Sequence, residues 1–334
     1  MKIEIPDCLP EKILVTGGAG FIGSHLVESL LYSGRYVTVL DNMSNGNEQW
    51  LNSVKGLKNF KFVCAELTDF AQVQATMRTQ EQVWHFAGNA DIPLGYTNTL
   101  IDIDSAVYGT RNVLQAMVSE GVKDIIFASS GSVYGSLAET KYVTEKSGSL
   151  YPLSMYAAGK IAAESFISSF ANLFGIRGWI FRFGNVLGTR MSRGAIKDFA
   201  LRLNKNSERL KILGDGKQAK SYFLVEDCLT GMMWLLANFV MHKERSVEIF
   251  NLGNAGVTSV LTIAKYVAQA MKIPNLEFYF TGGSLGWPGD QPIVQLDVSK
   301  VTRLGWSPQY DSDTAVRIAS ERMIQYLGLG EEEK

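Results

Sequence analysis

Within its first 41 residues the chain runs through a strand, a glycine-rich turn, a helix and a second strand. The apolar stretch Lys12–Thr16 leads into Gly-Gly-Ala-Gly-Phe-Ile-Gly at 17–23, a helical pattern follows over Ser24–Ser33, and Tyr36–Leu40 ends at Asp41. Two strands joined by a crossover helix are typical of a parallel α/β sheet. The glycines allow a pyrophosphate to approach the backbone and the free N–H groups of the helix. The order of elements disfavours the alternative, a glycine turn that binds nothing.

The acid that ends the second strand predicts which dinucleotide binds. Asp41 stands eighteen residues beyond Gly23, where a carboxylate can accept hydrogen bonds from both hydroxyls of the adenosine ribose. Its charge would repel a 2′-phosphate, which favours NAD over NADP. The other residues expected at the cofactor follow the first four strands. With Asp41 they are Gly17, Gly20, Phe21, Ile22, Gly23, Asn42, Ser44, Asn45, Gly46, Glu66, Leu67, Phe86, Ala87 and Gly88.

Further apolar runs predict how the fold continues. Strands are expected at Phe60–Cys64, Glu81–Phe86, Asp124–Ser129 and Arg177–Phe183, with helices at Thr68–Arg78, capped by Thr68, and at Tyr96–Glu120. The fold class is therefore a Rossmann-type doubly wound parallel sheet with a smaller C-terminal α/β substrate-binding part. We divide it into residues 1–184, the NAD-binding domain, and 185–330, a part intertwined with the first because no clean linker separates them. His85 is expected to be a structural histidine.

A tyrosine and a lysine four residues apart indicate proton transfer. Tyr156 and Lys160 would share one face of a long helix, and an ammonium near a phenol lowers the phenol pKa from about 10. Such a tyrosine can take a proton from an alcohol, with a serine at a strand end holding the oxygen. Tyr142 and Lys146 have the same spacing, but their segment is β-branched and runs into loop residues, so we interpret that pair as chance.

Composition excludes several partners. The formal net charge is -1 and no long basic run is present, which argues against nucleic acid or an anionic membrane. Three widely spaced cysteines favour a reducing, cytoplasmic compartment, and no metal-ligand spacing is visible. The polar, proline-containing N-terminus is unlike a signal peptide, and no apolar run reaches the roughly 18 residues of a membrane span.

Several motifs together carry a family resemblance. They are Thr16–Gly23, Asp41-Asn42, His85–Gly88, Ser129–Gly135, Tyr156 with Lys160, Arg182–Gly188 and Gly214–Gly216. With these residues the chain resembles the extended short-chain dehydrogenase/reductases, in the branch of NAD-dependent nucleotide-sugar epimerases and dehydratases. Within that branch it is most similar to UDP-glucose 4-epimerases, over about residues 12 to 310.

The resemblance implies a role for each site residue. Tyr156 would take the proton of the sugar's 4-hydroxyl while hydride passes from C4 to NAD, and the 4-keto sugar would turn before hydride returns. Lys160 would hold the nicotinamide ribose, so that Tyr156 and Lys160 also belong to the cofactor site, and Ser130 would bind the 4-oxygen. The residues expected at the substrate are Ser130, Ser132, Asn185, Lys220 and Trp287.

Departures from the family pattern sharpen the assignment. Dehydratases of the family place an Asp-Glu pair after the serine, and decarboxylases keep a Glu there; this chain has Gly131-Ser132, which disfavours elimination. Relatives usually carry Asn at Ala106, often a cation at Ala90, Arg at Lys220 and commonly Arg at Trp287. Lys220 keeps the charge but loses bidentate phosphate geometry. Val294 falls near a position that narrows the sugar pocket, where a small residue is expected to admit a larger sugar.

Three functions remain open at this point. The first is a 4-epimerase of a UDP-hexose. The second is another NAD-dependent nucleotide-sugar enzyme, either an epimerase of a uronic acid, N-acetyl or non-UDP sugar or a net dehydrogenase. The third is a non-catalytic NAD sensor, disfavoured because both Tyr156 and Lys160 are present. The resemblance also implies a homodimer through the helices Tyr96–Glu120 and Met155–Phe174, although Ile101, Ile103, Val107 and Val113 could equally be buried within one subunit.

Overall fold

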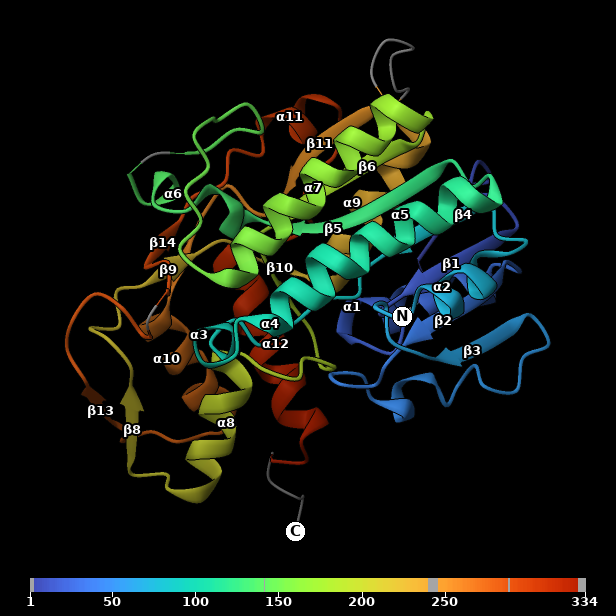
Figure 1. The fold of residues 1–334 in the computed structure, drawn as a ribbon. Helices are drawn as coiled ribbons and strands as arrows, with labels where there is room; N and C mark the ends of the chain where they lie inside the picture. Colours follow the sequence, from blue (N-terminus) through green and yellow to red (C-terminus); the bar gives the residue numbers. More distant parts are fainter. Residues whose placement is uncertain (1–2, 141, 240–245, 288, 330–334) are drawn as a thin grey trace.

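A twisted parallel sheet forms the centre of the computed structural model, which describes residues 3–140, 142–239, 246–287 and 289–329 (Figure 1). Every pair of neighbouring strands in it is parallel, as expected for strands joined by crossover helices. In spatial order the seven strands are β11 (Val247–Leu252), β6 (Arg177–Phe183), β5 (Asp124–Ser130), β4 (Gln82–His85), β1 (Lys12–Thr16), β2 (Tyr36–Asp41) and β3 (Phe60–Cys64). The Rossmann-type fold class is confirmed.

Helices cover both faces of this sheet (Figure 1). Leu26 of α1 and Met232 of α9 are buried with Val15 and Phe250 in the core on one face. Val113 and Met117 of α5 are buried in the core on the other face. The helices on the first face are α1 (Phe21–Tyr32) and α9 (Val225–Asn238), and those on the second are α2 (Phe70–Met77), α5 (Gly109–Glu120) and α7 (Met155–Phe174).

The helix expected over Tyr96–Glu120 is broken, so that prediction was wrong in its first half. The chain forms α3 (Leu94–Thr97), α4 (Leu100–Asp102) and a π-helical turn, η2 (Ile103–Tyr108), before α5 begins. A π-turn widens the helix and redirects its side chains, and such turns are frequent at functional sites. The cap of α2 also differs from expectation, because the Asp69 side chain, not Thr68, accepts the Gln72 N–H.

A smaller α/β part lies beside the carboxyl ends of the strands (Figure 1). Its own core joins Phe199, Leu210, Ile263 and Val316. Its helices are α8 (Ala195–Lys205), α10 (Val260–Ala270) and α12 (Ser312–Tyr326), and its strands are β7 (Asn185–Leu187), β8 (Arg209–Ile212), β9 (Ala219–Lys220), β10 (Tyr222–Leu224), β12 (Thr258–Ser259), β13 (Glu277–Phe280) and β14 (Ile293–Val294). The short helix α11 (Ser299–Arg303) instead packs against β11 of the central sheet, where its Val301 is buried. Short helical turns complete the fold at η1 (Glu48–Leu51), η3 (Gly131–Tyr134) and α6 (Leu137–Thr140).

The chain returns to the first sheet after it has built much of the second part. β11 pairs in register with β6, from Val247 opposite Gly178 to Leu252 opposite Phe183, and Phe250 is fully buried there. The two parts are therefore interleaved along the sequence.

Candidate active site

The register of the sheet brings three strand ends to one edge. Thr16 of β1 lies opposite Leu40 of β2 on one side and His85 of β4 on the other. The turns that follow these strands therefore meet where the strand order reverses between β1 and β4, the usual place for a ligand in such a sheet. His85 is structural, as predicted, because its ring nitrogens contact Thr16 Oγ1 at 2.7 Å and Thr110 Oγ1 at 3.0 Å.

The glycine turn leaves the start of α1 open. Gly20 precedes the helix and no side chain caps it, so the first N–H groups of α1 are available to an anion. A Cβ on Gly23 would stand 2.2 Å from the Gly17 carbonyl oxygen, and one on Gly17 would stand 2.6 Å from the Ala87 nitrogen. The turn can therefore close this tightly only with glycine at both positions, and this cradle fits a pyrophosphate.

Asp41 is held at the end of β2 by backbone groups. Its Oδ2 accepts the Ala19 N–H and its Oδ1 accepts the Met43 N–H, both at 2.9 Å. Burial raises the pKa of this carboxyl, and these two hydrogen bonds oppose the shift. Each oxygen keeps a free lone pair. Asn42 is fixed on the same side by a 2.9 Å hydrogen bond from its Nδ2 to Glu66. The arrangement suits two ribose hydroxyls.

All seventeen residues expected at the cofactor line one cleft of about 680 Å³. The cleft runs from the glycine turn and Asp41 to Tyr156 and Lys160 on α7. A cleft of this size falls within the range of cofactor sites. Sequence reasoning missed several of its polar lining residues. Ser129 belongs to the Ser129–Gly135 motif but was not assigned to the cofactor, and no motif offered a signal for Asn89, Asn98, Asp104, Ser105 and Ser192.

Tyr156 and Lys160 lie on α7 one turn apart, as predicted. The Ser154 side chain caps this helix by accepting the Ala157 N–H, and Gly175 ends it in the left-handed conformation. The Lys160 Nζ lies 5.7 Å from the centre of the Tyr156 ring and donates to the Ala128 carbonyl at 2.7 Å. By contrast, Tyr142 and Lys146 are exposed in a non-helical segment, which confirms that their spacing is chance.

The expected direction of the Tyr156 pKa was wrong. Burial raises the pKa of the Tyr156 phenol to about 12, a hydrogen bond with Ser130 opposes the rise, and the charge of Asp102 adds to it. Burial also lowers the pKa of the Lys160 ammonium to about 8, against the charges of Glu164 and Asp102. Spacing along the sequence does not reveal this desolvation, which is the largest influence on the Tyr156 pKa.

The residues expected at the substrate form separate groups outside the lining of this cleft. Ser130 is near Tyr156 and accepts a 2.9 Å hydrogen bond from the Ser132 hydroxyl. Asn185 contacts the Ser221 carbonyl through its Nδ2 at 3.3 Å. Lys220 pairs with the buried Asp290 at 2.9 Å and lies 5.2 Å from the centre of the Trp287 ring, whose buried Nε1 contacts no acceptor among the described residues. Asp290 is a further candidate that sequence reasoning missed.

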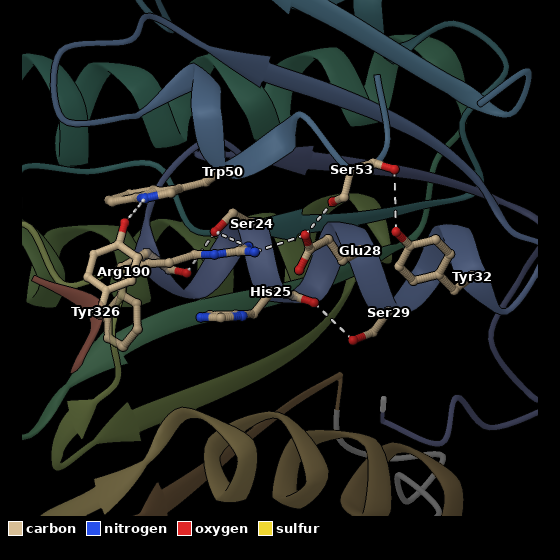
Figure 2. Close-up of polar contacts among 10 residues, drawn as sticks. Ser24, His25, Glu28, Ser29, Tyr32, Trp50, Ser53, Arg190 and Tyr326 are labelled. Atoms are coloured by element: carbon tan, nitrogen blue, oxygen red, sulfur yellow. Dashed lines mark hydrogen bonds and ion pairs between the residues drawn. The ribbon is translucent and has the colours of Figure 1, made fainter. Parts of the chain in front are cut away.

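A polar network fixes the loop after β7 to α1, the helix that starts at the glycine turn (Figure 2). Arg190 donates to Ser24 at 3.1 Å and pairs with Glu28 at 2.8 Å, and Glu28 also accepts a 2.5 Å hydrogen bond from Ser53. His25 lies beneath Arg190 in Figure 2, and burial, followed by the charge of Arg190, lowers its pKa to about 4. The network thus joins the two parts of the molecule beside the cofactor cleft.

Comparison with known proteins identifies the family. The model of the NAD dependent epimerase/dehydratase family matches residues 13–253. The chain belongs to this family. NAD is accordingly its cofactor. The putative UDP-glucose 4-epimerase of Methanocaldococcus jannaschii is 31% identical over 91% of this chain and 96% of its own length.

Other relatives of the chain are named for different activities. The crystal structure of UDP-glucose 4-epimerase from Thermus thermophilus in complex with NAD has a TM-score of 0.81 and 28% identity, covering 93% of this chain and 98% of that one. A dTDP-D-glucose 4,6-dehydratase of Bos taurus is 27% identical, covering 91% of this chain and 86% of its own length. The protein is thus an enzyme of the NAD-dependent nucleotide-sugar epimerase/dehydratase family. In the described part of the chain, no helix combines the length and the apolar character needed to cross a bilayer.

Proposed function

We propose that this family member is an NAD-dependent nucleotide-sugar 4-epimerase that interconverts UDP-hexoses of the UDP-glucose and UDP-galactose type. The observation that carries the proposal is the pair of residues directly after Ser130. The chain enters the 3-10 turn η3 there with Gly131 and Ser132, and a Cβ on Gly131 would stand 3.1 Å from Leu296. No carboxylic acid occupies these two positions, whereas elimination of water needs a proton donor and a base beyond those of the oxidation.

The chain's own residues handle the proton of the sugar alcohol. When bound, NAD supplies the hydride acceptor and, in its oxidised form, a positively charged ring. Tyr156 takes the proton from the 4-hydroxyl and later returns it, and positive charge in the cleft favours the phenolate that this requires. Ser130 holds the oxygen at C4, and Lys160 is fixed by the Ala128 carbonyl so that its charge remains beside the tyrosine.

The group around Lys220 is proposed to hold the nucleotide diphosphate. Its ammonium is fixed between Asp290 and the ring of Trp287. Val294 lies opposite Lys220 in the register of β9 and β14 and is buried, so it bounds the same region. Asn185 adjoins this region through its contact with Ser221, the residue after Lys220. This part of the site decides which sugar is accepted, and two of the departures from the family pattern, Lys220 and Trp287, lie in it.

The test begins with the purified protein as isolated. Mass spectrometry of the ligand released on denaturation is expected to find NAD, and incubation with UDP-glucose is expected to yield UDP-galactose without net NADH. A screen that includes UDP-glucuronate, UDP-N-acetylhexoses and dTDP-glucose separates the alternatives. Accumulating NADH would indicate a net dehydrogenase, and a 4-keto-6-deoxy product would indicate a dehydratase; either result contradicts the proposal.

We further propose a homodimer that pairs η2, α5 and α7 with the same elements of a second subunit. Support comes from apolar side chains that remain on the surface there, since Tyr108 is 57% and Leu173 68% exposed. Val113, by contrast, is fully buried within the subunit. Sedimentation of the protein is expected to show a dimer that Tyr108→Asp weakens, and a monomeric wild type would contradict this.

A further inference from the structure

A buried carboxylate stands behind the Tyr156–Lys160 pair. Asp102 ends α4 and is 1% exposed. Its Oδ1 accepts a 3.2 Å hydrogen bond from Asn89 Nδ2, while its Oδ2 is buried without a hydrogen-bond partner among the described residues. Burial raises the pKa of this carboxyl, while the Asn89 hydrogen bond and the charge of Lys160 oppose the rise and favour the anion. A buried carboxylate with an unpaired oxygen is costly, so its presence calls for a reason other than stability.

Two glycines allow Asp102 to pack closely: Gly159 of α7 makes room for its backbone, and Gly95 makes room for its carboxylate. A Cβ on Gly159, between Tyr156 and Lys160 in sequence, would stand 3.3 Å from the Asp102 carbonyl oxygen and 2.9 Å from Ala106 Cβ. A Cβ on Gly95 would stand only 2.4 Å from Asp102 Oδ2. The π-turn η2 starts at the next residue and carries Asp104 and Ser105 to the cofactor cleft. Asp102 is thus directed inward where its neighbours face the ligand.

Among the described residues, Lys160 is the cation whose charge acts on Asp102, because the other nearby charges are already paired or absent. Glu164, one turn along α7, forms a 2.6 Å ion pair with the buried Arg182 and accepts a 2.5 Å hydrogen bond from Ser129. His85 of β4 is neutral near pH 7, because burial and then the charge of Lys160 lower its pKa to about 3. Asp102 therefore contributes a negative charge that Arg182 does not offset.

We propose that Asp102 is a positioning residue of the catalytic pair, whose negative charge sets the protonation of Tyr156 and Lys160 from behind α7. This inference rests on the proposed function only in taking these two residues as the pair that handles the proton. Asp102 acts on both in the same direction. Its charge raises the pKa of the Tyr156 phenol and raises the pKa of the Lys160 ammonium. It thereby keeps the lysine charged while it restrains the tyrosine from losing its proton unaided.

The primary experiment replaces the charge and keeps the shape. Asp102→Asn retains an oxygen that can accept the Asn89 hydrogen bond. Both limbs of the pH profile of kcat/KM are expected to move to lower pH, by about one unit. A second measurement needs no substrate. The near-ultraviolet absorbance of tyrosinate, taken as the difference between a protein and its Tyr156→Phe counterpart, is expected to titrate at lower pH in Asp102→Asn than in wild type.

Gly95→Ala supplies an independent variant. Its backbone is compatible with alanine, and the added methyl displaces the Asp102 carboxylate. Introduced into the wild-type protein, Gly95→Ala is expected to shift the pH profile of kcat/KM. Introduced into the Asp102→Asn protein, it is expected to cause no further shift. The control is Asp198→Asn, which removes an exposed carboxylate on α8 and is expected to leave the profile in place.

The outcomes separate this inference from the proposed function. An unchanged tyrosinate titration in Asp102→Asn, or a rate that falls evenly at all pH values, would show that Asp102 is merely structural and would overturn the inference. A shifted titration in a protein that epimerises no nucleotide sugar would support the inference and contradict the epimerase proposal.

Discussion

The two ends of the site are built in different ways. At the nucleotide end, strand register and backbone groups form the surface: Gly17 and Gly23 close the turn, and two N–H groups hold Asp41. At the proposed sugar end, paired side chains from the smaller part of the molecule form the surface, with Lys220 fixed by Asp290 and packed near Trp287. A surface formed by the backbone permits little change in the ligand that it binds. A surface formed by side chains can differ between relatives that bind the same cofactor. We propose that this difference underlies the different substrate names of relatives with similar identity to this chain.

The largest effect is expected at Tyr156, which lies between the nucleotide end and the proposed sugar end. Tyr156→Phe removes the hydroxyl that exchanges the proton, so we expect kcat to fall by about 10³-fold, within the range for a lost acid–base group. NAD content, measured by mass spectrometry of the released ligand, should remain that of the wild type. Tyr142→Phe, at the exposed tyrosine with the same lysine spacing, is the matched control. Unchanged turnover in Tyr156→Phe would refute the catalytic assignment.

A substitution at the nucleotide end should affect the cofactor first. Gly23→Ala places a methyl 2.2 Å from the Gly17 oxygen, a backbone atom that cannot move aside without opening the turn. We expect NAD affinity, measured by isothermal titration, to weaken by about 100-fold, which is roughly 3 kcal/mol. Gly56→Ala is the control, because nothing lies within 4 Å of its added Cβ. Equal NAD affinity in both variants would show that the turn is not a close-fitting cradle.

A substitution at the sugar end should spare the cofactor. Lys220→Ala removes a cation from the proposed diphosphate site and leaves the buried Asp290 without its ion pair. We expect KM for the nucleotide sugar to rise about 10-fold, with a smaller change in kcat and unchanged NAD content, since the lost contact is made equally in the ground and transition states. Lys220→Arg keeps the charge and should largely restore KM. A loss of NAD from Lys220→Ala would show that the two ends are not separable.

The smallest effect concerns acid stability. Burial lowers the pKa of His25 to about 4, whereas an unfolded histidine titrates near 6.5. As the pH falls from that value toward 4, the unfolded state binds more protons, so the free energy of unfolding falls through this window and levels off below it. His25→Leu removes the titration, and we expect it to recover about 3 °C of Tm at pH 5 relative to wild type. Equal pH dependence of Tm in both proteins would assign the acid sensitivity elsewhere.

The sequence allowed the nucleotide end to be predicted far better than its surroundings. Gly17, Asp41 and Phe86 could be placed at one edge because parallel register follows from the strand pattern. The π-turn over Ile103–Tyr108 could not be predicted, because its residues continue a helical pattern and only their packing against Gly159 shows the change. The pKa of Tyr156 was misjudged for a related reason: desolvation depends on tertiary burial, which spacing along a helix does not reveal.

The position of β11 in the sequence, long after its partner β6, has a consequence for protein synthesis. A nascent chain that has just completed β6 carries an unpaired parallel edge along Arg177–Phe183, and the strand that covers it lies more than sixty residues later, at Val247–Leu252. Exposed strand edges recruit other strands, so a ribosome-bound or truncated product ending near residue 184 would be prone to self-association. Expression trials that cut the gene at the apparent domain boundary should therefore yield aggregates, whereas a cut after Leu252 restores the edge.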